Sequence, residues 1–367
     1  MEVIFDKDGS VDSFAKLLKQ IEQKGAKSAL IFSCDENDYT KNGIDEILKE
    51  CSFKIFGGVF PQIIFKDKNY SKGNLALLFD EDVEILVLQN ISTSAQNIKA
   101  IDEFLPKNLK TAFVFVDAFS KAISDVVEEL YYTYGAECKF LGGGAGSLNF
   151  VQKEVIFSND GFLKDSCVIA FLPFSSNIGV EHGWEAIGDF YQITKAKKNV
   201  IYGIDHRRAF DVYKEVVETH SGKKFDEFDF FELAKGYPLG VNKLDSEMVV
   251  RDPIATEDGA LICVGNVYER EYIKILHGKK ENLISATKEI SELVKKSCVS
   301  KDDVTIFIDC ISRVLFLEDD FDKEIRVVYE NYPNLIGALT LGEIANSSNE
   351  MLEFYNKTAV VAVINDK

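Results

Sequence analysis

Three stretches of the chain repeat the same order of apolar and polar segments. Each begins with an apolar run rich in β-branched and aromatic residues, continues into a stretch with helical spacing, and passes through a glycine-bearing segment to another apolar run. The opening runs are SALIFSC (28–34), TAFVFVD (111–117) and VTIFIDC (304–310). Continuous apolar runs of this length are typical of strands buried on both faces of a sheet. The pattern predicts one β-α-β-β unit used three times as an internal repeat.

The segments that follow the opening runs complete each predicted unit. In the last predicted helix, Phe321, Ile325 and Val328 recur at helical spacing and form one apolar face. Glycine permits close backbone approach, so the glycine segments suit either a tight bend or a ligand lying against main-chain N–H groups. We therefore expect an α/β fold with mixed β-sheets, for which two packed sheets flanked by outer helices is one arrangement. The predicted helices are 42–50, 119–134 and 319–332, the glycine segments 55–61, 140–147 and 335–343, and the closing strands 75–79, 167–174 and 359–364.

A different pattern separates the second unit from the third. Residues 183–205 alternate as strand, turn and strand, and 207–220 have the spacing of a helix. Residues 248–265 predict a hairpin that turns around Glu257-Asp258-Gly259. No Ser/Gly-rich linker interrupts the chain, so we expect two closely packed domains, 1–180 and 181–367.

Charge and composition narrow the class of protein. The chain has 42 Lys and Arg against 60 Asp and Glu, a net charge of −18, and no basic block, which argues against a nucleic-acid partner. Its start is acidic, and no apolar run approaches the roughly 18 residues that span a bilayer. We expect a cytoplasmic protein without a membrane partner. The cysteines are odd in number, 7, and none form C-x-x-C, so neither a disulfide framework nor a zinc knuckle is indicated.

The segment DCISRVLFL (309–317) carries the candidate binding chemistry. If residues 304–309 form a strand, Cys310, Ser312 and Arg313 lie at its carboxyl end, where open α/β sheets gather ligands. An Arg guanidinium can grip a carboxylate and a Glu carboxylate an ammonium group, so Arg313 and Glu343 together could hold a zwitterionic amino acid. The alternative is that these two residues pair with each other and brace the glycine bend. The predicted ligand-binding set is Cys310, Ser312, Arg313, Gly342, Glu343 and Asn356.

Two further chemistries stay open. Cys310 or Ser312 could act as a nucleophile, although a buried structural cysteine is the alternative, and no histidine is assignable as the base. The four histidines have no zinc-site spacing, so we predict no metal site. A haem needs only one axial histidine, for which His182 and His206 are the candidates.

Eight motifs in order give the chain a resemblance to a known family. The motifs are FLGGGAG (140–146), GWEAIG (183–188), YGIDHRRAFDVY (202–213), YPLGV (237–241), VVRDP (249–253), DCISRVLFL (309–317), GALTLGEI (337–344) and FYNKTAVVAV (354–363). In this order and spacing the chain resembles the FIST family, with a FIST N-terminal domain over 1–180 and a FIST C-terminal domain over 181–367. His206 departs from the pattern, where glycine is common.

The resemblance implies a sensory module that binds small ligands such as amino acids and reports to signalling proteins. Since the motifs fill the chain, we expect it to act in trans on a partner such as a histidine kinase or a cyclic-dinucleotide enzyme. The expected function is therefore a non-enzymatic small-ligand sensor that needs no cofactor. Some family members are similar to haem-based gas sensors, so a haem-based nitric oxide sensor is the first alternative. A cysteine- or serine-dependent enzyme is the second.

Overall fold

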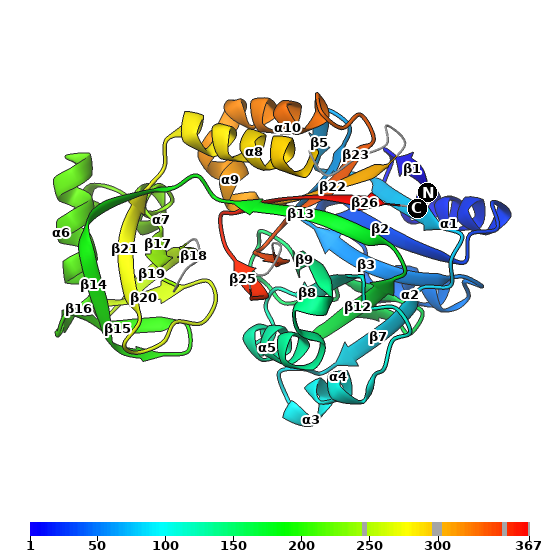
Figure 1. The fold of residues 1–367 in the computed structure, drawn as a ribbon, viewed down its shortest axis with the longest axis horizontal. Coiled ribbons are helices and arrows are strands. Elements are labelled where there is room, and N and C mark those ends of the chain that lie inside the picture. Colours follow the sequence, from blue (N-terminus) through cyan, green and yellow to red (C-terminus); the bar gives the residue numbers. More distant parts are fainter. Residues whose placement is uncertain (244–247, 296–302, 347–350, 366–367) are drawn as a thin grey trace.

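The chain forms two lobes joined by two crossings (Figure 1). The computed structural model describes residues 1–243, 248–295, 303–346 and 351–365. Residues 185–277 make the small lobe, and the segments before and after them make the large lobe. Both crossings are short: the chain enters the small lobe between Glu181 and Glu185 and leaves it between His277 and Lys280. Over the described ranges, no helix combines the length and apolar character needed to cross a bilayer.

The described strands of the large lobe form three mixed sheets, so the mixed α/β class is confirmed. The first sheet is ordered β1 (Glu2–Asp6), β6 (Asn74–Phe79), β2 (Ser28–Cys34), β3 (Lys54–Phe60), β10 (Ile156–Ser158), β11 (Gly161–Leu163). The second is ordered β25 (Glu353–Tyr355), β24 (Glu343–Ala345), β9 (Lys139–Ala145), β8 (Thr111–Asp117), β12 (Ser166–Leu172), β7 (Glu84–Gln89). The third is ordered β13 (Ser175–Glu181), β26 (Ala359–Asn365), β22 (Val304–Cys310), β23 (Leu335–Thr340), β4 (Gln62–Phe65), β5 (Lys68–Tyr70).

The three sheets share one topology. In each, the strand that opens a predicted unit pairs in parallel with the glycine-bearing strand and antiparallel with the closing strand: β2 with β3 and β6, β8 with β9 and β12, β22 with β23 and β26. Every residue of these three opening strands is buried, as their continuous apolar runs predict. The sheets therefore have the β-α-β-β organisation expected of the units, and an internal sequence repeat stays a prediction.

The sheets are connected by an exchange of hairpins. The hairpin β4–β5 follows β3 in the chain but pairs with β23, β10–β11 follows β9 but pairs with β3, and β24–β25 follows β23 but pairs with β9. Each unit thus completes the sheet of another unit. The described strands form three sheets in the large lobe and one in the small lobe. The arrangement of two packed sheets, which the sequence suggested as one possibility, is therefore not found among them.

One glycine in each glycine-bearing strand explains the glycine segments. Gly57, Gly142 and Gly337 lie opposite Ile31, Val114 and Phe307 of the parallel neighbour. A Cβ atom added at these glycines would come within 2.0, 1.9 and 1.9 Å of the neighbouring carbonyl oxygen, respectively. The glycines are needed for close approach of two strands inside the sheet, and not for a bend at its edge.

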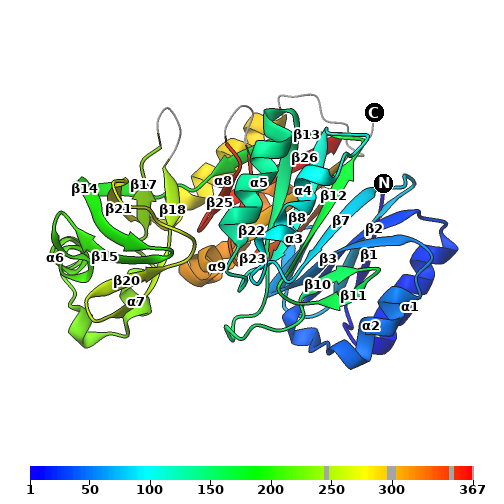
Figure 2. The same ribbon diagram turned by 90° about the horizontal axis from the view of Figure 1, so that it is seen from below.

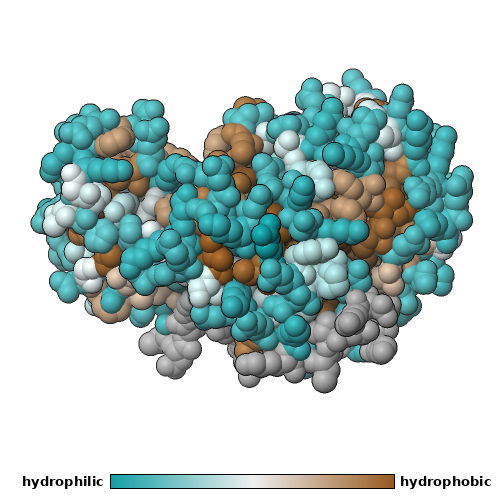
Figure 3. Space-filling model, turned by 90° about the horizontal axis from the view of Figure 1, so that it is seen from above, coloured by the Kyte–Doolittle hydropathy of each residue, from teal (hydrophilic) through white to brown (hydrophobic). Residues whose placement is uncertain are grey.

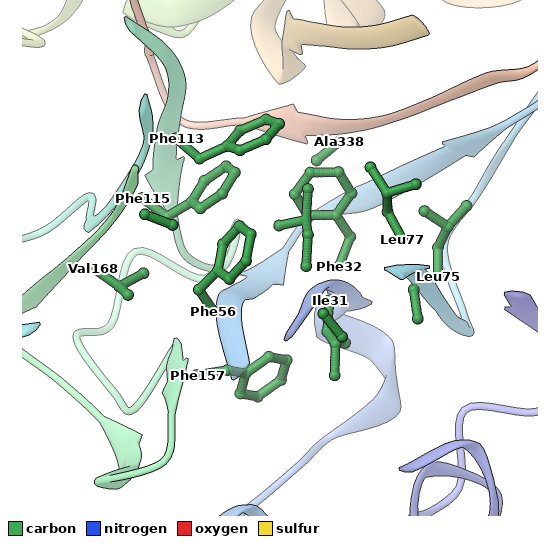
Figure 4. Packing of buried hydrophobic residues seen from close by; sticks show 14 of the residues in the cluster. Ile31, Phe32, Phe56, Leu75, Leu77, Phe113, Phe115, Phe157, Val168 and Ala338 are labelled. Atoms are coloured by element: carbon green, nitrogen blue, oxygen red, sulfur yellow. The ribbon is translucent and has the colours of Figure 1, made fainter. Parts of the chain in front are cut away.

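The sheets bury one apolar core between them. Phe56 of β3 lies 5.9 Å from Phe113 of β8, and Phe32 of β2 lies 5.5 Å from Phe115, measured between ring centroids. Figure 4 shows these rings together, with Ala338 of β23 on the side of the third sheet. The helices lie outside: α1 (Val11–Gln23) and α2 (Lys41–Lys49) beside the first sheet, α3 (Ala95–Ile98), α4 (Ala100–Glu103) and α5 (Ile123–Tyr134) beside the second, and α8 (Lys280–Lys295), α9 (Ile311–Leu317) and α10 (Phe321–Tyr329) beside the third.

The small lobe is a curled antiparallel sheet with its own core. Its strands run in the order β18 (Val249–Arg251), β17 (Leu239–Val241), β21 (Tyr272–His277), β14 (Glu185–Lys197), β15 (Val200–Ile204), β20 (Ala260–Cys263), β19 (Pro253–Glu257), with β16 (Arg207–Arg208) paired to β15. The predicted hairpin is confirmed, because β19 and β20 turn at Asp258 and Gly259, which both have positive φ. The helices of this lobe are α6 (Ala209–Ser221) and α7 (Phe230–Ala234). Figure 2 shows α9 of the large lobe at the junction with the small lobe.

Most of the surface in one view of the protein is polar. Figure 3 shows one face of both lobes, where hydrophilic residues cover most of the area and apolar residues gather in smaller patches.

Candidate functional site

A cavity of about 1030 Å³ lies at the junction of the two lobes. The large lobe contributes the carboxyl ends of β8 and β22, with Ala118 and Cys310, and the small lobe contributes residues from the β14–β15 turn and from β18–β20. Several walls are apolar, and four of the lining side chains are phenylalanines: Phe119, Phe150, Phe231 and Phe354. A cavity of this size that combines apolar walls with polar side chains is typical of a small-molecule site.

Asp252 is the buried carboxyl group of this cavity. It lines the cavity with only 2% of its surface exposed. Its Oδ2 atom lies 3.1 Å from Lys357 Nζ and accepts a hydrogen bond from Ser312 Oγ at 3.3 Å. Its Oδ1 atom has no hydrogen-bond partner among the described residues. Burial raises the pKa of Asp252, whereas Lys357 and Ser312 oppose that shift. Asp252 is therefore a lining residue whose carboxyl group keeps one buried acceptor atom without a partner among the described residues.

Lys357 ties this carboxyl group to both lobes. The side chain is 0% exposed, and its ammonium donates to the Lys235 carbonyl oxygen at 3.0 Å. The same ammonium lies 5.2 Å from the ring centroid of Trp184, whose Nε1 donates to the Lys357 carbonyl oxygen. Trp184 is the single tryptophan of the chain and stands at the crossing into the small lobe. Its fluorescence is therefore a natural reporter of the junction.

The predicted site residues divide into two groups. Cys310, Ser312, Gly342 and Asn356 line the cavity. Asn356 Oδ1 accepts a hydrogen bond from the Asp252 backbone N–H at 3.2 Å and so helps to position that residue. Arg313 and Glu343 are not among the lining residues, and both are fully buried.

The Arg313 guanidinium is occupied by ion pairs and hydrogen bonds within the protein. Its guanidinium forms ion pairs with Asp309, at 3.1 Å, and with Glu324. It also donates to the carbonyl oxygens of His182 and Leu283, at 2.6 and 3.1 Å. These partners come from β22, α10, the first crossing and α8, so Arg313 braces the elements behind the cavity wall. Such a saturated guanidinium is not available to a ligand carboxylate. The alternative pairing of Arg313 with Glu343 also finds no support, since Arg313 takes Asp309 and Glu324 instead.

Glu343 is a buried carboxyl group held by local donors. Its two oxygens accept hydrogen bonds from Thr340 Oγ1, at 2.8 Å, and from the Thr358 backbone N–H, at 3.2 Å. Burial outweighs these bonds and raises the pKa of Glu343 to about 8. The group is therefore largely protonated at neutral pH, which weakens it as a partner for a ligand ammonium.

We expect Glu343 to make stability fall with rising pH. Its pKa is about 8 in the folded protein, against 4.5 for an ordinary Glu. The folded state therefore keeps a proton that the unfolded state has released, so this stabilisation is complete below pH 4.5 and is lost as the pH rises through 8. Between pH 6.5 and 8 the loss amounts to about 2 kcal/mol. Urea denaturation followed by Trp184 fluorescence measures it.

The control for this pH effect is Glu343→Gln, which mimics the protonated carboxyl. His182 does not contribute to the change above pH 6.5. Burial lowers its pKa to about 4, so it alters the stability only below pH 6.5, the ordinary pKa of a histidine. The variant should show a shallower fall than the native protein. Parallel stability curves for the two proteins would contradict the prediction.

The thiols of the cavity are poor nucleophiles. Burial raises the pKa of Cys310, with the neighbouring Glu343 adding to the shift, and burial raises the pKa of Cys263 to about 12. A thiol reacts as its thiolate, so neither group is activated in this environment. Ser312 has Asp252 as its polar neighbour and no histidine base.

The two histidines proposed as haem ligands lie outside the cavity. No histidine is found among its described lining residues. His182 accepts a hydrogen bond from the Trp184 backbone N–H at Nδ1, and His206 is exposed at the turn before β16. The cavity therefore does not fit a histidine-ligated haem, and haem binding elsewhere stays a prediction. No cluster of three or more potential metal ligands occurs in the part of the chain that the structure describes.

Comparison with known proteins decides the family. A model of the FIST N domain matches residues 16–207, and a model of the FIST C domain matches residues 209–346. The chain belongs to the FIST family. The predicted family is thus confirmed, and FIST domains are small-ligand sensors associated with signal transduction. The sequence-based boundary near residue 180 stays a prediction.

A curated relative is similar over most of this FIST protein. It is an uncharacterized protein of Methanocaldococcus jannaschii, 21% identical, and the alignment covers 93% of this chain and 74% of the relative. The similarity supports a shared architecture and says nothing further about a ligand.

The predicted site residues of this FIST protein do not include the buried ion pair of Asp252 and Lys357. Asp252 lies in the VVRDP motif and Lys357 in FYNKTAVVAV, two of the motifs that carry the family resemblance. Nothing local in either motif shows that its charged residue is buried. The two charges are buried together because each would be costly to bury alone.

Proposed function

We propose that this FIST protein is a sensor that binds a small molecule in the cavity between its lobes and acts in signal transduction through a separate partner. The observation that carries the proposal is the unpartnered, buried Oδ1 atom of Asp252, a residue that lines a cavity of about 1030 Å³. Leaving a buried acceptor unpaired costs about 1–3 kcal/mol, and a ligand that donates a hydrogen bond would recover that cost.

The position of the cavity connects binding to a change of shape. A ligand there would contact Phe119 and Ser312 of the large lobe and Phe231 of the small lobe. A ligand shifts a conformational equilibrium only if it binds one arrangement better than another, and contacts to both lobes supply such a difference. The second crossing is tightly packed, since a Cβ atom on Gly278 would lie 2.3 Å from the Trp184 ring. Movement of the lobes would therefore alter the surroundings of Trp184.

The ligand and the partner belong to the proposal. Amino acids are the first class to test, because the family resemblance implies them, and organic acids are the second. A histidine kinase and a cyclic-dinucleotide enzyme are the candidate partners in trans. Either partner would recognise the relative placement of the two lobes.

A screen of amino acids and organic acids tests this function. A compound that binds should raise the melting temperature and change Trp184 fluorescence. Phe150→Ala should then weaken binding about two- to tenfold, because an aromatic contact contributes about 0.5–1.5 kcal/mol.

The matched control is Val151→Ala. Phe150 and Val151 are neighbours with 62% and 61% exposure, but only Phe150 lines the cavity. Both variants should fold normally, and the control should keep native affinity. A lack of response to every compound, or equal effects of the two variants, would count against the cavity as the sensing site.

A further inference from the structure

The cavity wall at Asp252 is already neutral in charge. Asp252 and Lys357 form an ion pair with 2% and 0% of their surfaces exposed, so the carboxylate has its counter-ion. The nearby Arg251 donates to the Phe354 carbonyl oxygen at 2.8 Å and lies 3.9 Å from Glu353. A ligand ammonium placed at Asp252 would add an uncompensated positive charge to a desolvated region, which is costly. A neutral O–H or N–H donor satisfies Asp252 Oδ1 without that cost.

The phenylalanines of the lining favour an aromatic body in the ligand. Phe119 and Phe150 contact each other edge to face, with ring centroids 6.1 Å apart, on the large-lobe wall. Phe231 stands on the small-lobe wall and Phe354 beside Gly342. Rings of a ligand can pack against such side chains in offset or edge-to-face arrangements, each worth about 0.5–1.5 kcal/mol.

The remaining charged side chains of the lining favour an anion. Lys121 of the large lobe and Lys198 of the small lobe line the cavity and are exposed, and neither forms a salt bridge with a carboxylate of the described residues. The protein as a whole carries a net charge of −18, so two unpaired cations at one cavity are a local exception. They lie on opposite lobes. An anionic group that contacts both would link the two lobes.

We propose that the cavity takes an aromatic organic anion: its neutral hydroxyl or N–H donates to Asp252, its ring packs among the phenylalanines, and its carboxylate faces Lys121 and Lys198. This inference rests on the proposed function and narrows the ligand class of the same site. It separates such molecules from free amino acids, whose ammonium group would meet an Asp252 carboxylate that already has Lys357 as its counter-ion.

Four small probes test the inference by calorimetry on the full chain. The parent probe is para-hydroxyphenylacetate, which has both the donor and the carboxylate. Phenylacetate lacks the donor, para-cresol lacks the carboxylate, and para-(aminomethyl)phenylacetate replaces the hydroxyl with an ammonium group. We expect the parent to bind most tightly, with loss of the donor weakening binding about tenfold, the effect of a hydrogen bond to a charged group. The ligand is varied here because a change of Asp252 would leave Lys357 unpaired.

Lysine variants test the proposed contact with the ligand carboxylate. Lys121→Ala and Lys198→Ala should each weaken binding of para-hydroxyphenylacetate about threefold and reduce its salt dependence, as expected for screened charges. Neither should change the affinity of para-cresol. The control Lys19→Ala alters an exposed lysine of α1 and should have no effect.

The outcomes separate this inference from the proposed function. Equal binding of phenylacetate and the parent, tighter binding of the ammonium probe, or no binding of any probe would overturn the inference. If an amino acid binds in the broader screen with the Phe150 dependence described above, the sensor function stands while this ligand class fails. Failure of both experiments would remove the site itself.

Discussion

Arg313→Ala is expected to lower the free energy of unfolding by about 3–5 kcal/mol, because it leaves buried carboxylates without their counter-ion. The Arg313 guanidinium is 0% exposed and pairs with Asp309 and Glu324, which are also fully buried. Burial and the neighbouring Glu324 raise the pKa of Asp309. Protonation of that carboxyl group relieves part of the lost stability, which accounts for the lower end of the expected range. Urea denaturation at constant pH, followed by Trp184 fluorescence, measures the change.

The matched control for Arg313 is Arg326→Ala. Arg326 lies on α10, close in sequence to Glu324, but is exposed, so its loss should change stability by about 0.5 kcal/mol or less. Arg313→Lys provides a second comparison. A lysine keeps the charge but lacks the planar fork that reaches several acceptors at once, so an intermediate loss is expected. A stability change below about 1 kcal/mol for Arg313→Ala would show that the guanidinium does not brace this region.

Gly337→Ala is expected to cost about 3 kcal/mol or more, or to prevent folding. The added methyl group would lie 1.9 Å from the Phe307 carbonyl oxygen, an atom of the parallel strand next to it. A side chain could rotate away, but a backbone atom inside a sheet cannot move without breaking the pairing of β22 with β23. Soluble yield and, where the variant folds, the midpoint of urea denaturation measure the effect.

Gly222→Ala controls for the loss of a glycine as such. Gly222 ends α6 with φ at 71°, and a Cβ atom there meets nothing within 4 Å. This substitution should cost about 1–2 kcal/mol, the strain of a left-handed alanine. If Gly337→Ala behaves like this control, close strand approach is not the reason for the glycine. Gly57 and Gly142 occupy the equivalent positions of the other two sheets and should respond as Gly337 does.

Both predictions concern the support of the cavity rather than its lining. Ser312 and Cys310 are held in place by α9 and the end of β22, and Arg313 ties α9 to α8 and α10 behind them. The large lobe thus presents one wall of the cavity, and the small lobe presents the other across two short crossings. This division suits a sensor, because ligand contacts can change the placement of one lobe without disturbing the core of the other.

Patterns of neighbouring residues are sufficient to predict the local strands, helices and turns, and the ordered motifs are sufficient to predict the family. Continuous apolar runs predict β2, β8 and β22, and the residues from 28 to 34, 111 to 117 and 304 to 310 are all buried in strands. Helical spacing places α10, and Asp258-Gly259 places the hairpin turn. These predictions succeed because hydrophobic period and turn chemistry depend on residues close together in the chain.

Which strands pair, and which buried charges form ion pairs, depends on the tertiary structure and not on the local sequence. The exchange of hairpins pairs Glu343 with Gly143, and nothing local to either segment specifies that choice. The sequence predicted that Arg313 and Glu343 bind the ligand. In the structure, Arg313 pairs with Asp309 and Glu324 instead. The buried carboxyl group of the cavity is that of Asp252, which pairs with Lys357. A buried charge takes whichever opposite charge the fold brings beside it, and that proximity arises only when distant strands and two lobes come together.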